Sequence, residues 1–313
     1  EDTSITFDAT MKTIGSYSFN GCSKLASILS FGGITTINEN AFSSTIIQPV
    51  IIPSTVTSIK TDAFSSNEAL KYVDYKGTTN PCGTTTVKAF QSIGNETATV
   101  PINYGATTMC GLTPMTGGTC GDKCKWSFNH ATKELIINGG GVMTNYGTKG
   151  APWYDKRTEI KTISISDVTT IGNYGFAECS KLENVTYPVT ITSKSSTIFE
   201  GCEMMKIITL NGKGPMQTYS EGNQPWNSVM TQITTINIGD EVESIGMYSF
   251  KGASGITTIE LKNVETIESY AFSNSGISEI TIPNNVKTIG TNAFGYCTKL
   301  SGIVLHDEIT SIG

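Results

Sequence analysis

Cysteine is the most reactive residue type in this chain, and its eight copies fall into two groups. Four lie close together in one segment, at Cys82, Cys110, Cys120 and Cys124. Four cysteines in a short segment can form disulfides or hold a zinc ion. A zinc site needs four converging ligands at finger-like spacing, and Cys120 and Cys124 with His130 match that spacing poorly. We therefore expect no metal site.

The histidines and carboxylates do not occur in the combinations that catalytic sites require. Neither His130 nor His306 lies near a cysteine that is flanked by other triad residues. A glycosidase needs two carboxylates about 5–10 Å apart across a cleft, whereas acidic residues such as Glu260 and Glu279 are scattered at solvent-facing positions. The run that starts at Gly139 lacks the Lys-Ser/Thr of a phosphate loop. We expect a protein that is not an enzyme and that carries no cofactor.

Trp153 and Trp226 allow two interpretations. Flat, exposed aromatic rings bind the faces of sugars, and this keeps a carbohydrate-active enzyme as a distant alternative. Each tryptophan, however, follows a proline at the same position of a longer repeat, at Pro152 and Pro225. This regularity favours a structural role, in which each ring fills the core where a loop leaves the fold.

An internal repeat of 22 or 23 residues runs through most of the chain. Its fullest form is Ile280-Thr-Ile282-Pro283-Asn-Asn-Val286-Lys-Thr-Ile289-Gly290-Thr-Asn-Ala293-Phe294. The Ile-x-Ile dyad has the period of a strand with both isoleucines on one side, and the proline ends the strand. Val-x-x-Ile-Gly then turns the chain, and Ala-Phe places a ring inside. The phenylalanines that mark the period are Phe19, Phe42, Phe64, Phe176, Phe199, Phe250, Phe272 and Phe294.

A single repeat of this length cannot bury enough apolar surface to be stable alone. Repeats must therefore stack, share one interior and join their strands in a parallel sheet. This predicts a curved solenoid in which Phe42, Phe64, Phe272 and Phe294 line up along one inner column.

The pattern resembles the BspA-like leucine-rich repeat of surface proteins from mucosal bacteria and parasitic protists, over about residues 1–76 and 160–313. The resemblance implies an α/β-type solenoid that is rich in strands, with a parallel sheet on the concave face and short turns and short helical segments opposite. It also implies a secreted or cell-surface protein that binds a host matrix protein, a cell-surface protein or a glycan. A structural stalk or coat segment that presents another domain is the alternative.

Breaks in the repeat predict three parts. Residues 1–76 form a first repeat block, and the turn-rich residues 77–125 form a cysteine-containing connector. Residues 126–313 form a second block, with elongated units at about 135–165 and 208–238 whose Met, Pro and Trp recur 73 residues apart. Both ends of the chain consist of repeat sequence, so we expect a fragment of a longer protein, with any signal peptide or membrane anchor outside it.

In a surface protein the four clustered cysteines indicate two disulfides. Four cysteines allow three connectivities, of which we favour Cys82–Cys110 with Cys120–Cys124. The remaining cysteines each follow a repeat phenylalanine by three residues, which predicts small apolar core residues with free thiols. They are Cys22, Cys179, Cys202 and Cys297.

The residues between the buried members of each dyad are expected to line the open face of the sheet and to contact a partner. They offer hydroxyl and amide groups over a wide area but few large apolar anchors. Threonine also suits exposed strand positions for structural reasons alone, and the sequence does not separate the two interpretations. The set is Tyr72, Asp74, Thr162, Ser164, Asn184, Thr186, Thr209, Thr235, Asn237, Thr258, Glu260, Glu279 and Thr281.

The charge pattern excludes some partners. The net charge is −6 and the basic residues form no cluster, so we expect no binding to nucleic acid and no polybasic attachment to a membrane. No apolar stretch is long enough to insert into a bilayer.

Asn95-Glu-Thr97 and Asn184-Val-Thr186 are candidate N-glycosylation sites if the source is a eukaryote, and Asn184 is the weaker acceptor because it lies on a predicted strand.

Overall fold

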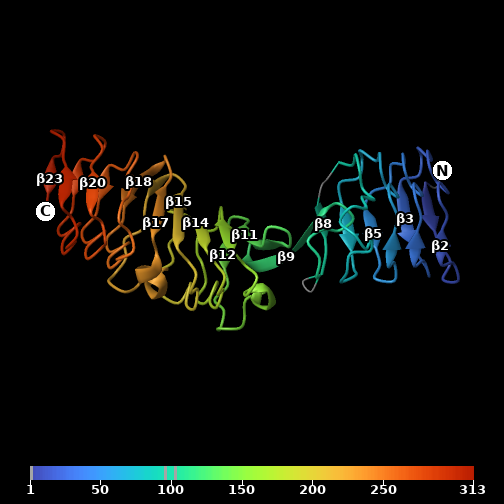
Figure 1. Cartoon of the computed structure of the whole chain (residues 1–313), viewed down its shortest axis with the longest axis horizontal. Helices are drawn as coiled ribbons and strands as arrows, with labels where there is room; N and C mark the ends of the chain where they lie inside the picture. Colours follow the sequence, from blue (N-terminus) through green and yellow to red (C-terminus); the bar gives the residue numbers. More distant parts are fainter. Residues whose placement is uncertain (1–2, 95–96, 102–103) are drawn as a thin grey trace. The chain divides into compact units, whose positions relative to one another are not determined.

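The structure is a computed structural model that describes residues 3–94, 97–101 and 104–313. Its contacts divide the chain into two compact units, which are Glu1–Gly117 with Phe128–Thr132 and Gly118–Ser127 with Lys133–Gly313. Each unit is a series of chain coils that lie one against the next (Figure 1). The three predicted parts remain a prediction; by contacts, residues 77–117 group with the first unit and residues 118–125 with the second.

Coils of the first unit contribute short strands to two kinds of parallel sheet. The first kind consists of the dyad strands: β1 pairs with β3, and β5, β7, β8 and the start of β9 pair in that order. The second kind contains β2, β4 and β6. Buried and exposed side chains alternate along the dyad strands, as in Val50, Ile51 and Ile52. The strands are β1 (Ser4–Thr6), β2 (Thr13–Ile14), β3 (Ser27–Ser30), β4 (Thr36–Ile37), β5 (Val50–Ile52), β6 (Ser58–Ile59), β7 (Val73–Tyr75), β8 (Thr97–Thr99) and β9 (Thr113–Asp122).

The second unit repeats this arrangement. Its dyad strands pair in parallel in the order β11, β13, β14, β15 and β17, with β20 and β22 as a further pair, and its second sheet contains β16, β18, β19, β21 and β23. Strand β10 lies next to β11, and β12 pairs with β9 in the antiparallel direction. The strands are β10 (Cys124–Asn129), β11 (Glu134–Asn138), β12 (Val142–Met143), β13 (Thr162–Ile165), β14 (Asn184–Pro188), β15 (Ile207–Asn211), β16 (Gly214–Pro215), β17 (Thr235–Ile238), β18 (Val242–Ile245), β19 (Thr266–Ile267), β20 (Glu279–Thr281), β21 (Thr288–Ile289), β22 (Gly302–Val304) and β23 (Ser311–Ile312).

Helix is nearly absent from the described residues. The helical segments there are two 3₁₀ helices, η1 (Tyr154–Lys156) and η2 (Asn227–Gln232), each of which begins directly after a tryptophan of an elongated unit. Turns cover the rest of the side opposite the dyad strands, where the resemblance implied short helical segments. Within the part of the chain that the structure describes, no helix has the length and apolar character needed to cross a membrane.

The Val-x-x-Ile-Gly segment is a strand rather than only a turn, which corrects the prediction of one sheet. Thr36 and Ile37 pair in parallel with Ser58 and Ile59 of the next coil, and Ile37 is fully buried. The glycine that follows allows the close approach of neighbouring coils: a Cβ at Gly290 would lie only 2.4 Å from the backbone nitrogen of Ser269.

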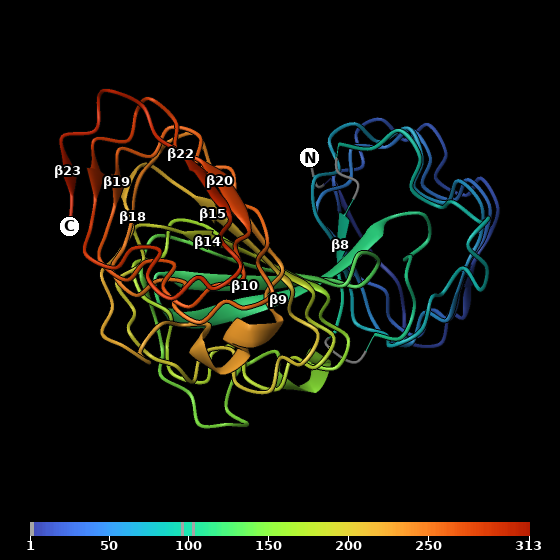
Figure 2. The same ribbon diagram turned by 60° about the vertical axis from the view of Figure 1, so that its left-hand side comes forward.

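The repeat phenylalanines form the predicted inner columns. Phe42 stacks on Phe64 with ring centroids 5.2 Å apart, and Phe272 stacks on Phe294 at 5.6 Å. The coils of each unit lie one behind another when viewed obliquely along the stack (Figure 2), so that equivalent residues of neighbouring coils meet.

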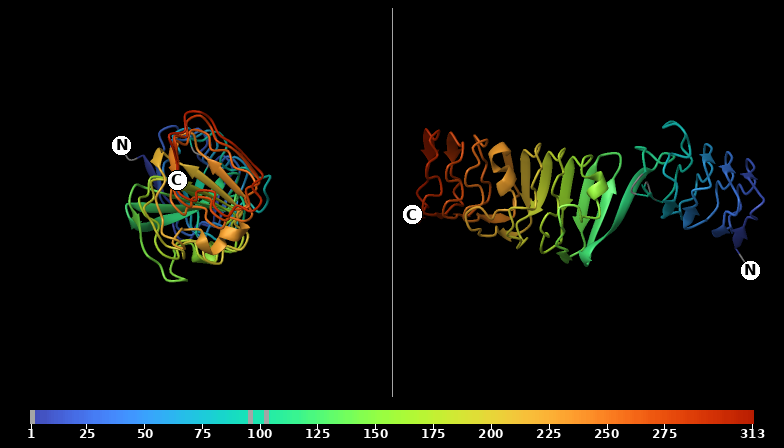
Figure 3. Two further views of the ribbon diagram at one scale, coloured as in Figure 1. Left: turned by 90° about the vertical axis from the view of Figure 1, so that its left-hand side faces the viewer. Right: turned by 90° about the horizontal axis from the view of Figure 1, so that it is seen from below.

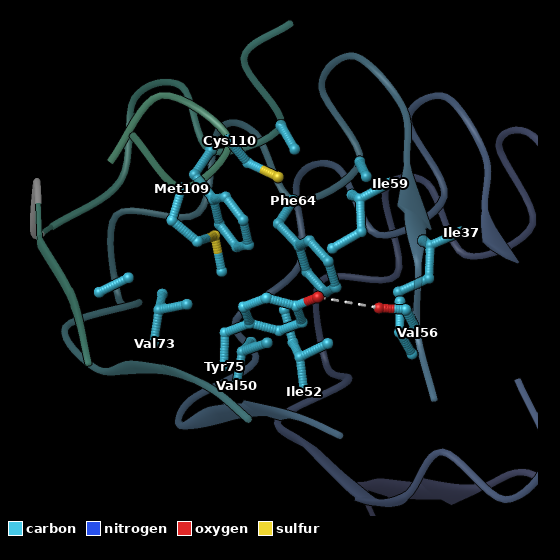
Figure 4. Close-up of a cluster of buried hydrophobic side chains, with 14 of the residues drawn as sticks. Ile37, Val50, Ile52, Val56, Ile59, Phe64, Val73, Tyr75, Met109 and Cys110 are labelled. Carbon is cyan, nitrogen blue, oxygen red and sulfur yellow. Dashed lines mark hydrogen bonds between the residues drawn. The ribbon is translucent and has the colours of Figure 1, made fainter. Parts of the chain in front are cut away.

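Aliphatic dyad residues enclose the column in the first unit. Figure 4 shows Phe64 facing a layer of side chains that includes Val50, Ile52 and Tyr75. The Tyr75 hydroxyl donates a hydrogen bond of 3.4 Å to the carbonyl oxygen of Val56. Apolar side chains from both sheets therefore make one continuous interior, and the residues that alternate with them are left to face outward.

Candidate functional site

The outward-facing residues of the dyad strands form two rows across the second unit. In the parallel register of β11, β13, β14, β15 and β17, each member of a row lies opposite its counterpart on the next strand. The strands lie side by side in the right-hand view of Figure 3. The first row is Glu134, Thr162, Asn184, Ile207 and Thr235, and the second is Ile136, Ser164, Thr186, Thr209 and Asn237.

Neighbouring members of a row are about 4.8 Å apart because that is the spacing of paired strands. Two hydrogen bonds join side chains of adjacent strands: Ser164 Oγ donates to Glu134 Oε1, across the two rows, at 2.6 Å, and Asn237 Nδ2 donates to Thr209 Oγ1, within the second row, at 3.2 Å. Thr186 lies between Ser164 and Thr209 in the same row. The second row therefore presents a hydroxyl or amide group on each of β13, β14, β15 and β17, whereas Ile207 interrupts the first row.

A depression of about 590 Å³ lies further along the second unit, where Thr258, Glu260, Glu279 and Thr281 gather around β20. All four side chains are exposed. The nearby Lys262 Nζ lies 3.0 Å from a carboxylate oxygen of Asp240. The predicted residues from two different coils thus meet at one hollow, which combines two carboxylates with two hydroxyl groups.

The first unit departs from the prediction at Asp74. Tyr72 is exposed, at 47%, but Asp74 is only 7% exposed. In the sheet Asp74 lies between Ile51 and Thr99 of the neighbouring strands, and its carboxylate pairs with Lys76 Nζ at 2.5 Å. Neighbours on both sides and the lysine cover it, so Asp74 is not part of the open surface as predicted.

Apolar residues on the open face of the first unit were not among the predicted contacts. Leu29 is 69% exposed and Ile51 49% exposed, and both line a depression of about 340 Å³ together with Phe31 and Pro53. The signal was present in the sequence, because Ile51 lies between the buried Val50 and Ile52. It was missed because the outward positions were expected to be polar.

Both tryptophans are buried, which confirms the structural interpretation and removes the sugar-stacking hypothesis. Trp153 is 1% exposed and Trp226 fully buried. Their Nε1 atoms donate hydrogen bonds to the carbonyl oxygens of Gly175, at 3.0 Å, and of Ser249, at 2.7 Å. Burial next to Trp153 raises the pKa of the Tyr146 phenol to about 12. These aromatic clusters belong to the core.

Both favoured disulfides are present in the structure. Cys82 and Cys110 are bonded with their Cα atoms 5.3 Å apart, and Cys120 and Cys124 with theirs 5.0 Å apart. Among the predicted core cysteines, Cys22 is instead exposed. It lies on the first described coil, which is covered on one side only in the described part of the chain.

Other predicted sites have separate outcomes. Asn95 lies outside the described residues. Asn184 lies on β14 between β13 and β15, its Oδ1 atom is buried, and its glycosylation stays a prediction. In residues 3–94, 97–101 and 104–313, no three His, Cys, Asp or Glu side chains converge in a way that could hold a metal ion.

Comparison with known proteins gives a family match and several matching solved structures. The family described as "BspA type Leucine rich repeat region (6 copies)" matches residues 2–106, 153–220 and 228–313. The search of curated proteins found no match to the sequence.

Three of the solved structures that match the chain are bacterial proteins, each with a TM-score below 0.5. A leucine-rich repeat protein from Bacteroides ovatus is 20% identical, with a TM-score of 0.39 over 96% of this chain and 78% of that one. A leucine-rich cell surface protein from Faecalibacterium prausnitzii is 16% identical, with a TM-score of 0.32 over 96% and 78%. The pneumococcal vaccine antigen PcpA is 15% identical, with a TM-score of 0.28 over 99% and 70%.

Proposed function

Because the chain belongs to the BspA-type leucine-rich-repeat family, we propose that it is a non-catalytic binding module that acts outside the cell. Its stacked coils make a solenoid in each unit, with the dyad strands on the concave side. The open face of these strands binds a host matrix protein, a cell-surface protein or a glycan.

The observation that carries this proposal is the polar second row across β13, β14, β15 and β17. The residues of this row, Ser164, Thr186, Thr209 and Asn237, are partly or fully exposed and repeat at the strand spacing, so an extended partner can form hydrogen bonds with several coils at once. Each contact is weak, and affinity rises when several copies of the module engage a partner together.

Uncovered apolar side chains support a binding role over a purely structural stalk. A stalk needs no exposed Leu29 or Ile51, whereas such side chains next to a hollow are typical of protein contact sites. The stalk predicts no such patch, so this feature favours the binding module.

The disulfides support a location outside the cytosol. Cys82–Cys110 and Cys120–Cys124 are bonded in the structure, and such bonds persist mainly in oxidising compartments. A secreted or surface-displayed protein meets this condition.

The test is solid-phase binding of the full chain to immobilised matrix proteins, to a glycan array and to fixed host cells. We expect saturable binding to at least one of them. The double variant Glu260→Lys with Glu279→Lys reverses both charges at the β20 depression and should weaken that binding by about tenfold or more, equivalent to about 1.4 kcal/mol.

The matched control is Glu200→Lys with Glu203→Lys, which makes the same charge change on exposed turn residues away from the dyad strands. It should bind as the unmodified chain does. Absence of saturable binding to every surface would contradict the module, and equal loss in both double variants would show that net charge, rather than the open face, controls binding.

A further inference from the structure

The position three residues after the repeat phenylalanine holds a small side chain in most coils, and in several of them this side chain bonds to a nearby backbone carbonyl. Thr45 Oγ1 donates to the carbonyl of Phe42 at 3.0 Å. Cysteine replaces this hydroxyl in other coils: Cys202 Sγ donates to the carbonyl of Phe176 at 3.2 Å, and Cys297 Sγ donates to that of Phe272, also at 3.2 Å.

Cys179 and Cys202 occupy this position in two consecutive coils. The phenylalanines that precede them, Phe176 and Phe199, stack with centroids 5.4 Å apart. The backbone nitrogen of Glu178, the residue before Cys179, donates to the carbonyl oxygen of Glu200 at 2.7 Å. Both cysteines are fully buried, with free thiols.

The two thiols also contact each other. A hydrogen bond with Cys202, together with burial, raises the pKa of the Cys179 thiol well above its ordinary value. A thiol in this state reacts slowly, and so the pair reacts mainly before the two coils have closed around it.

The geometry of stacked coils suits a disulfide. Cys179 and Cys202 lie outside the strands, at equivalent positions of consecutive coils whose strands are about 4.8 Å apart, and disulfides span Cα–Cα distances of about 4.4–6.8 Å. The same chain already joins Cys82 to Cys110 at 5.3 Å. Cys297 differs, because the residue in register with it on the preceding coil is Ser275, whose Oγ lies 3.2 Å from its sulfur.

We propose that Cys179 and Cys202 are the site of a third disulfide, which joins two consecutive coils between the two elongated units. It forms by exchange with a low-molecular-weight disulfide. The thiolate of one cysteine attacks that disulfide and releases one small thiol; the thiolate of the other then attacks the mixed disulfide and releases the second. Two protein thiols are oxidised to one S–S bond, and the small disulfide is reduced to two thiols.

The test is disulfide mapping of the full chain after refolding with oxidised and reduced glutathione, in the mixture at which the Cys82–Cys110 bond closes. Free thiols are blocked with N-ethylmaleimide under denaturing conditions, and the unreduced digest is analysed by mass spectrometry. We expect a linked pair of peptides containing Cys179 and Cys202, about 2 Da lighter than the two thiol peptides together. Cys297 should carry the label.

Labelling of Cys179 and Cys202 to the same extent as Cys297 would overturn the proposal. In the variant Cys202→Ser, Cys179 loses its partner and should become labelled as Cys297 is. If Cys179 remains protected in that variant, it is bonded elsewhere and the proposed pairing is wrong. The mapping on the unmodified chain stands by itself if the variant folds poorly.

Discussion

The aromatic column predicts a large and specific loss of stability when one ring is removed. Phe250 is fully buried, and its ring lies between those of Trp226, at 5.3 Å and 7°, and Phe272, at 5.7 Å and 16°. Phe250→Ala leaves a cavity between two stacked rings, and substitutions of this kind cost about 3–5 kcal/mol. That is a large share of the roughly 5–15 kcal/mol that stabilises an ordinary domain.

A second variant separates cavity formation from ring stacking. Phe250→Leu keeps most of the buried apolar volume but loses both stacked contacts, each of which contributes about 0.5–1.5 kcal/mol. We therefore expect Leu to cost about 1–3 kcal/mol, clearly less than Ala. Tyr296→Ala is the control, because Tyr296 is 76% exposed and its loss should change stability by about 0.5 kcal/mol or less.

Urea unfolding followed by tryptophan fluorescence measures these differences. All three tryptophans, Trp126, Trp153 and Trp226, lie in the same unit as Phe250, so the signal reports the unfolding of that unit. The reasoning is refuted if Phe250→Ala costs less than about 1 kcal/mol, or if Leu costs as much as Ala, since neither result is compatible with a ring held between two others.

Three further predictions concern backbone contact and titration. Gly290→Ala places a Cβ 2.4 Å from the Ser269 nitrogen and should cost about 1–3 kcal/mol in urea unfolding; Gly302→Ala, with no atom within 4 Å, should be neutral, and equal effects would argue against the close approach. Burial by itself would raise the pKa of Glu159, but hydrogen bonds from two lysines outweigh it and lower the pKa. Glu159→Gln should therefore reduce the free energy of unfolding by about 0.5 kcal/mol at neutral pH, a value discounted for the exposure of the side chain, and by nothing once the pH falls below the folded pKa. A difference in stability that persists in acid would contradict this. Burial raises the pKa of Tyr146 to about 12, so its neutral form stabilises the fold below pH 10 and this contribution is lost as the pH rises toward 12. Tyr146→Phe should remove that part of the decrease in stability at alkaline pH, measured by unfolding at a series of pH values. An unchanged profile would exclude a contribution from Tyr146.

The binding face was only partly predictable, for a local reason. The period of two places alternate residues outward, and this rule located the rows that contain Thr162 and Ser164. It says nothing about what neighbouring strands and side chains cover. Asp74 obeys the rule but is buried beside Lys76, whereas Ile51 obeys it and stays exposed.

The sequence alone determined the repeat and most of the residues of its interior, because both depend on spacing along the chain, whereas it left three pairings of the clustered cysteines open. A side chain that recurs every 22 or 23 residues must occupy the same place in every coil, and this is why Phe42, Phe64, Phe272 and Phe294 could be assigned to inner columns before any coordinates. The regular position of Trp153 and Trp226 was informative in the same way.

Only the tertiary structure decided which short segments pair, and which side chains lie next to each other across coils. The Thr36–Ile37 pair is too short to show a strand period, and it becomes a strand only because Ser58 and Ile59 lie beside it. Likewise, Cys179 and Cys202 each look like an ordinary core residue in the sequence, and their contact exists because consecutive coils stack in register. Contacts between coils depend on the register of stacking, which spacing along one coil does not specify.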